Sequence, residues 1–226
     1  LTELPKRYEG EIVLGTETTT LDAAGEITAT HDMSAVTDDQ VRAAANRLTG
    51  DLMQVPPMVS AIKIDGKRLH ELAREGKEVD RPPRPVRVDR FDVEPVEGAR
   101  GVWRCVVDCS SGTYIRSLAA DLGTALGGGA HLRSLRRTSV GGFTLDDAGT
   151  IESPTLLPVS AAVQHLELAL VDEDTAVLVG HGRVLPLEQL QVSGGGPWAV
   201  LGEDGALLAV YESHRQGGKP TVVIPR

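Results

Sequence analysis

The chain has 226 residues, enough for one large domain and a small one. Its 32 acidic and 23 basic residues give a net charge of −9, which argues against nucleic-acid binding through overall charge but allows a local basic face. No apolar run approaches the ~20 residues of a membrane span. Cys105 and Cys109 lie too far apart on a predicted strand for a disulfide, and no cluster has zinc spacing. We expect a reduced, metal-free cytoplasmic protein.

Strands and helices are predicted in turn along the first part of the chain. Residues 8–14 alternate well enough for a strand. Residues 37–40 form a capping box, which predicts a helix that ends at Gly50. After a proline pair, an extended segment reaches Lys63, and a short helix then ends at Gly76. This part of the chain therefore includes an excursion from the main fold.

A strand-to-helix turn near the middle of the chain is the most informative segment. Residues 102–109 read as a buried strand, and residues 115–122 have helical spacing before Gly123, where we expect the helix to stop. Tyr114 and Arg116 lie at the turn between them. An aromatic ring beside a guanidinium suits a flat base with an anionic neighbour. The alternative interpretation is a tyrosine that anchors the core and an arginine on the surface.

The rest of the chain predicts one more helical face and then a separate small domain. Leu132 and Leu135 are spaced as on one face of a helix. A short apolar helix is expected around residues 159–166. Residues 198–211 predict a hairpin turned by an Asp-Gly pair, and residues 222–224 predict a last strand. The expected domains are residues 1–158 and residues 159–226.

Two groups of basic residues are candidates for phosphate contacts, although such runs usually mean a solvated surface. No acidic residue interrupts the second group. The candidates are Lys63, Lys67 and Arg68 in the first group, and Arg133, Arg136 and Arg137 in the second.

Residues 109–118 read C-S-S-G-T-Y-I-R-S-L and resemble the C-S-x-G-T-Y-I-R-x-L signature of TruB-type tRNA pseudouridine synthases. Further stretches are similar to family motifs and occur in the family's order. They are residues 6–8, 14–25, 54–63, 66–69, 73–76 and 129–138.

The resemblance implies an α+β fold with a mixed, largely antiparallel sheet flanked by helices. Within it, residues 58–84 would form a thumb that grips RNA, and the C-terminal domain would be PUA-like. The implied enzyme is an isomerase that converts the T-loop uridine at position 55 of tRNA to pseudouridine, binds the T-arm stem-loop and needs no cofactor. No apolar pattern demands a protein partner, so we expect a monomer.

The resemblance also implies roles for single residues. Tyr8 matches the tyrosine that stacks on the target uracil, and Arg116 matches the arginine that orients the nucleophilic aspartate. Tyr114 matches the pocket tyrosine on the opposite side, and Leu135 matches the apolar wall of the pocket. Each of the four also has a purely structural interpretation as core or surface.

The family's nucleophile lies in a G-x-L-D-P-x-A-x-G motif upstream of the Lys-x-Tyr strand, and this motif is not among the 226 residues. Asp22 follows Tyr8 in a T-L-D-A-A-G run and is interpreted as a turn residue. We therefore expect a truncated enzyme that is inactive alone, with Arg116 lacking its carboxylate. The alternatives are a non-catalytic tRNA-binding module or chaperone of tRNA folding, and a protein-interaction scaffold.

Overall fold

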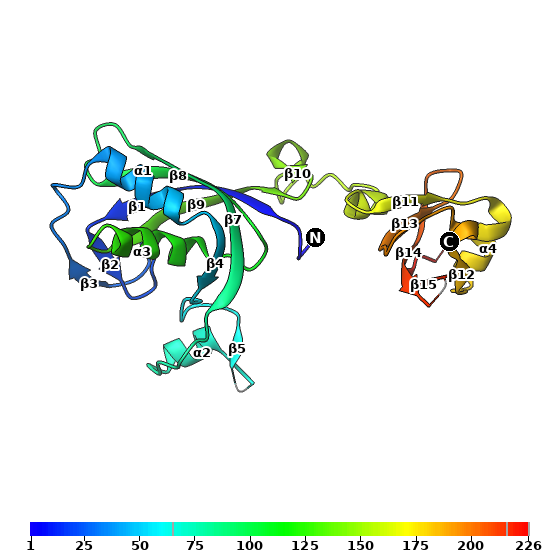
Figure 1. Cartoon of the computed structure of the whole chain (residues 1–226), viewed down its shortest axis with the longest axis horizontal. Coiled ribbons are helices and arrows are strands. Elements are labelled where there is room, and N and C mark those ends of the chain that lie inside the picture. Colours follow the sequence, from blue (N-terminus) through cyan, green and yellow to red (C-terminus); the bar gives the residue numbers. More distant parts are fainter. Residues whose placement is uncertain (65, 216, 226) are drawn as a thin grey trace. The chain divides into compact units, whose positions relative to one another are not determined.

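The computed structural model describes residues 1–64, 66–215 and 217–225. The chain divides into two compact units, Leu1–Leu145 and Asp146–Arg226 (Figure 1). Each unit has its own sheet and its own buried core. Among the described residues, no helix is long and apolar enough to cross a membrane.

A six-stranded sheet forms the centre of the first unit. Every neighbouring pair in it is antiparallel, so the predicted α+β class with a largely antiparallel sheet is confirmed. The strand order is β10-β9-β1-β8-β7-β4. The strands are β1 (Lys6–Leu14), β4 (Gly50–Gln54), β7 (Arg84–Pro95), β8 (Val102–Cys109), β9 (Ala130–Val140) and β10 (Phe143–Thr144).

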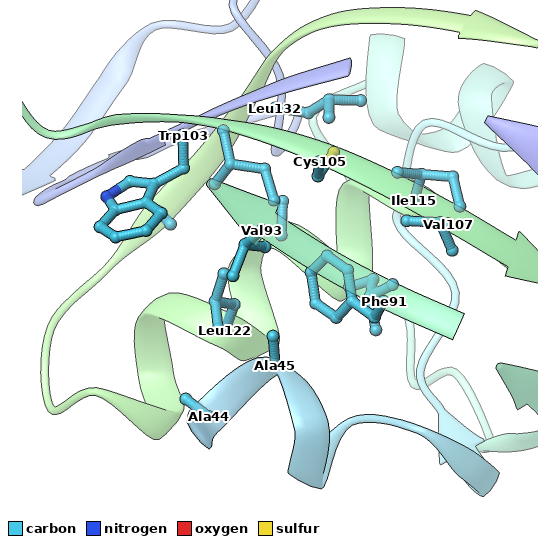
Figure 2. Packing of buried hydrophobic residues seen from close by; sticks show 14 of the residues in the cluster. Ala44, Ala45, Phe91, Val93, Trp103, Cys105, Val107, Ile115, Leu122 and Leu132 are labelled. Carbon is cyan, nitrogen blue, oxygen red and sulfur yellow. The ribbon is translucent and has the colours of Figure 1, made fainter. Parts of the chain in front are cut away.

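Two helices, α1 (Asp38–Arg47) and α3 (Ile115–Ala125), cover one face of this sheet. Phe91 pairs with Val107 in register, and Val93 pairs with Cys105. Directly opposite residues share a face, so these four side chains pack together beneath the helices (Figure 2). The other face is charged and open to solvent, and we call the two faces the helix face and the open face.

The start of α1 was predicted correctly, because the Thr37 capping box is present in full. The predicted end of α3 is wrong. Gly123 lies inside the helix, where an added Cβ would come within 2.4 Å of Ala130 N and of Gly129 C. The glycine therefore allows close packing of α3 on the start of β9 and does not end the helix.

The helical spacing of Leu132 and Leu135 was also misleading, because both lie on strand β9. The β1–β9 register shifts between Glu11 and Ile12, so that Leu135 pairs with Gly10 while Leu132 pairs with Ile12. Side chains alternate along β1, so Gly10 and Ile12 share the helix face. The β-bulge thus places two leucines three positions apart on one face, as a helix would.

Smaller elements complete the first unit. The hairpin of β2 (Thr16–Thr18) and β3 (Ile27–Thr30) follows β1. A second small hairpin, followed by a short helix, lies between β4 and β7. Its elements are β5 (Lys63–Ile64), β6 (Lys67–Arg68) and α2 (Leu69–Arg74). A 3-10 turn at Leu145–Asp147 follows β10.

The second unit is β-rich, with a sheet in the order β11-β13-β14-β15-β12. The hairpin β13–β14 is as predicted, with Gly205 at φ 76° in its turn. The expected helix around residues 159–166 is a short 3-10 helix, Val159–Val163. The other elements are β11 (Glu167–Leu170), α4 (Glu173–Gly180), β12 (Leu185–Pro186), α5 (Leu187–Leu190), β13 (Trp198–Leu201), β14 (Leu207–His214) and β15 (Gly217–Val223).

Candidate active site

Arg116 stands in the first turn of α3 and connects three segments that are distant in the sequence. Its Nη1 donates to Thr20 O at 3.2 Å and to Asp22 Oδ2 at 3.0 Å. Its Nη2 donates to Val59 O at 2.6 Å. The Arg116 and Asp22 side chains are only 22% and 26% exposed. Arg116 is therefore held in a defined, charge-assisted geometry and is not a free surface arginine.

The loop around Asp22 holds the Asp22 carboxylate in a fixed position beside Arg116. Asp22 Oδ1 accepts from the Thr20 hydroxyl at 2.5 Å and from Ala24 N at 3.1 Å. The loop docks on β9, where Ala23 N donates to Leu132 O at 2.9 Å. Arg116 thus has a carboxylate partner within the chain, contrary to our expectation, and Asp22 is more than a turn residue. The sequence signal for this carboxylate was the aspartate in the T-L-D run, which the motif comparison assigned to a turn.

Tyr8 and Leu135 lie on the helix face of the sheet, on the neighbouring strands β1 and β9. Tyr8 pairs with Val107 on one side and with Arg137 on the other. Leu135 is 44% exposed although it is apolar. A Cβ on Gly10 would lie 3.3 Å from Leu135 Cδ1, so the Leu135 side chain lies against Gly10 of β1. The two predicted pocket residues therefore share a face with the core beneath α3.

Tyr114 is the N-cap residue of α3 and is half-buried. It lines a cavity of about 350 Å³. The other lining residues are mostly apolar, with one exposed arginine, Arg84, among them. The aromatic ring that the sequence placed at the strand-to-helix turn thus adjoins a cavity large enough for a small planar group.

The structure separates the second group of basic residues. Arg137 is on the helix face beside Tyr8, whereas Arg136 pairs in register with Glu9 on the open face. Arg133, at the bulge, forms an ion pair with Glu11 at 3.5 Å. The three arginines do not form the single acid-free cluster that the sequence suggested.

The first basic group stays together on the small β5–β6 hairpin. Lys63 pairs in register with Arg68, and all three side chains are exposed. Lys67 forms an ion pair with Glu75 at 3.5 Å. This hairpin presents positive charge to solvent, with one of its charges partly neutralised.

The two cysteines contribute no reactive thiolate. Both are free and buried. Burial raises the pKa of the Cys105 thiol to about 12 and that of Cys109 to about 11. Among the described residues there is also no group of three His, Cys, Asp or Glu side chains placed to hold a metal ion.

Chains of two solved structures share the fold of this chain. A chain of the crystallised Cbf5-Nop10-Gar1 complex superposes with a TM-score of 0.67 at 22% identity, covering 100% of this chain and 68% of that one. A chain of the archaeal box H/ACA sRNP Nop10-Cbf5 complex gives 0.63 at 20% identity, covering 100% and 68%.

Comparison with known sequences identifies the family of the chain. The sequence model "TruB family pseudouridylate synthase (N terminal domain)" matches residues 1–115, and "tRNA pseudouridylate synthase B C-terminal domain" matches residues 116–177. The chain is 42% identical to tRNA pseudouridine synthase B of Rhodococcus jostii, over 97% of this chain and 73% of that protein. It is 45% identical to the Streptomyces griseus protein of the same name, over 96% and 76%. The chain belongs to the TruB family.

Proposed function

We propose that this chain is the body of a tRNA pseudouridine synthase that converts the T-loop uridine at position 55 of tRNA to pseudouridine. Two of the similar proteins are named tRNA pseudouridine synthase B and are 42% and 45% identical to it over the aligned residues. The observation that carries the proposal is the Arg116 guanidinium, fixed by three acceptors at the end of the sheet that bears Tyr8.

The target uracil, turned out of the RNA stack, is bound between aromatic and apolar side chains in this proposal. Flipping a nucleotide costs a few kcal/mol, and stacking on an aromatic side chain returns ~1–3 kcal/mol per base. Tyr8 and Tyr114 provide the rings, and Leu135 provides the apolar wall. Arg116 provides the fixed positive charge that orients the reacting carboxylate.

Asp22 acts here as the carboxylate that holds Arg116, and it is not the nucleophile. Its Oδ2 accepts from Arg116 and its Oδ1 from Thr20 and Ala24. The family's nucleophile lies in a motif upstream of the tyrosine that Tyr8 matches, whereas Asp22 lies downstream of Tyr8. Among the described residues, Asp22 is the carboxylate in contact with Arg116. We therefore expect no turnover from these residues alone.

We assign the RNA contacts from the positions of the basic residues on the sheet and on the β5–β6 hairpin. Residues 58–84 form the thumb, with Lys63, Lys67 and Arg68 on its hairpin. Arg137 stands on the helix face beside Tyr8, whereas Arg133 and Arg136 contribute little to RNA binding. Residues 1–158 form the catalytic domain, and residues 159–226 form a PUA-like RNA-binding domain. The enzyme acts as a monomer in the cytoplasm and needs no cofactor.

The test uses a T-arm stem-loop and two proteins. The first is the 226-residue chain. The second is the same chain joined to a segment carrying the family's G-x-L-D-P-x-A-x-G motif. We expect both to bind the stem-loop with strong salt dependence, and only the second to form pseudouridine. An Asp→Asn change in the added motif should abolish turnover but not binding.

Failure of both proteins to bind the stem-loop would overturn the proposal. Binding by both without turnover in either would favour a tRNA-binding module or folding chaperone. Insensitivity of the binding to salt would favour a protein-interaction scaffold.

A further inference from the structure

Gln54, the last residue of β4, makes an unusual pair of hydrogen bonds to a single distant residue. Its Nε2 donates to Tyr114 O at 3.1 Å, and Tyr114 N donates to its Oε1 at 2.8 Å. The side-chain amide thus bonds Tyr114 as a neighbouring strand's peptide would. Gln54 is only 3% exposed. A buried amide with both ends paired is costly to replace by an apolar group, because both backbone groups of Tyr114 would lose this partner.

The bonded residue is the point at which the chain turns into the catalytic helix. Tyr114 is extended, at φ −98° and ψ 109°, and has no side-chain cap bond of its own. Its carbonyl also accepts the first helical bond, from Leu118 N at 3.0 Å. Fixing this peptide therefore fixes both where α3 starts and where the Tyr114 side chain leaves the backbone. Arg116 follows two residues later.

The residues after Gln54 bond the same helical turn twice more. The Ser117 hydroxyl donates to Val55 O at 3.0 Å, and Arg116 Nη2 donates to Val59 O at 2.6 Å. Both of these bonds use side chains of α3, which can rotate. Among the described residues 54–59, Gln54 is the one whose side chain bonds the backbone at the start of α3. We call residues 54–59 the strap.

We propose that Gln54 is a positioning residue for the isomerisation, which sets the directions of Tyr114 and Arg116 through the backbone of Tyr114. The inference rests on the proposed function for what these two side chains do. Gln54 itself touches no reacting atom.

The experiment uses the full chain with Gln54→Met, which keeps the length of the side chain and removes both hydrogen bonds. Val41→Ala is the control, since it truncates a buried residue of α1 away from the strap. Losing the bond should speed hydrogen exchange of the Tyr114 amide and of the Arg116 guanidinium by about tenfold or more. Stem-loop affinity should fall by about tenfold. Val41→Ala should leave both exchange rates and the stem-loop affinity unchanged, even if it lowers the Tm as much as Gln54→Met does.

Two further variants separate positioning from simple stabilisation. Gln54→Glu retains the acceptor for Tyr114 N and should be intermediate in amide exchange. Gln54→Met combined with Tyr114→Ala should bind RNA no more weakly than Tyr114→Ala alone, because Gln54 acts on binding through the direction of the Tyr114 ring. Additive losses, or unchanged Arg116 exchange in Gln54→Met, would overturn the role. If the unsubstituted chain fails to bind, the proposed function fails, and the exchange data alone decide on Gln54.

Discussion

Gly123→Ala should destabilise the first unit, because α3 approaches the start of β9 most tightly at this glycine. The added Cβ would lie 2.4 Å from Ala130 N and from Gly129 C, and 2.7 Å from Ala130 Cβ. Ordinary contact begins at about 3.4 Å, so helix and strand must separate by about 1 Å. The obstructing atoms include backbone, which cannot rotate away as the end of a side chain can.

The expected loss is about 2 kcal/mol. Overpacking of this kind costs ~1–3 kcal/mol, and backbone obstruction places it at the upper end. Alanine gains ~1 kcal/mol over glycine in a helix, which offsets part of the cost. For a unit of this size the loss corresponds to a fall in Tm of about 4–8 °C.

Thermal unfolding followed by near-UV circular dichroism measures this change, with Gly180→Ala as the matched control. Gly180 also lies in a helix, but nothing is within 4 Å of its added Cβ. The control should be neutral, or stabilising by up to ~1 kcal/mol. A Gly123→Ala protein as stable as the unsubstituted chain would refute the packing argument.

Three further predictions concern charge and burial. Asp22→Asn should lower the unfolding free energy of the first unit by ~1.5–3 kcal/mol in urea titrations, because it removes a charged acceptor from Arg116. Burial raises the pKa values of Cys105 and Cys109 from 9.0 to about 12 and about 11. The contribution of the two buried thiols to the unfolding free energy is therefore fully present below pH 9 and should be lost as pH rises toward 12. Alkylation of the two thiols in the folded protein at pH 8 should be slow. Arg137→Ala should reduce the salt slope of stem-loop binding by ~0.7–0.9, whereas Arg136→Ala should not.

Each of these three predictions can be contradicted by a specific result. Asp51→Asn removes an exposed partner of Arg87 at 3.2 Å, with side chains 84% and 57% exposed, and should cost no more than ~1 kcal/mol. An equal loss in Asp22→Asn would contradict the ion-pair argument. Rapid labelling of both thiols in the folded protein would contradict their burial. Equal salt slopes for the two arginine variants would contradict the assignment of faces.

Local patterns in the sequence were enough to predict several elements. The Thr37 capping box, the strand before Tyr114 and the hairpin of the second unit all depend on residues within a few positions of one another. Each signal is short-range chemistry, such as a hydroxyl that caps an N-terminus or a glycine that permits positive φ. For that reason the elements that they predict are present in the structure.

The features that local patterns missed depend on residues distant in the chain. The bulge that aligns Leu132 with Leu135 exists only because β9 pairs with β1. The ion pair of Arg116 with Asp22 joins residues 94 positions apart, and Gln54 meets Tyr114 across 60 positions. The T-L-D run supplies an aspartate, but nothing near Asp22 or Gln54 in the sequence indicates which distant residue each one contacts. The motifs therefore located the site but did not show how its residues come together.

The most direct test of this account is pseudouridine formation in a T-arm stem-loop by the 226-residue chain, on protein shown to bind that stem-loop. The account predicts salt-dependent binding and no pseudouridine, because Asp22 is the carboxylate that holds Arg116 and the family's nucleophile motif is not among the 226 residues. Pseudouridine that forms with the unsubstituted chain and disappears with Asp22→Asn would contradict it, and would make Asp22 the nucleophile.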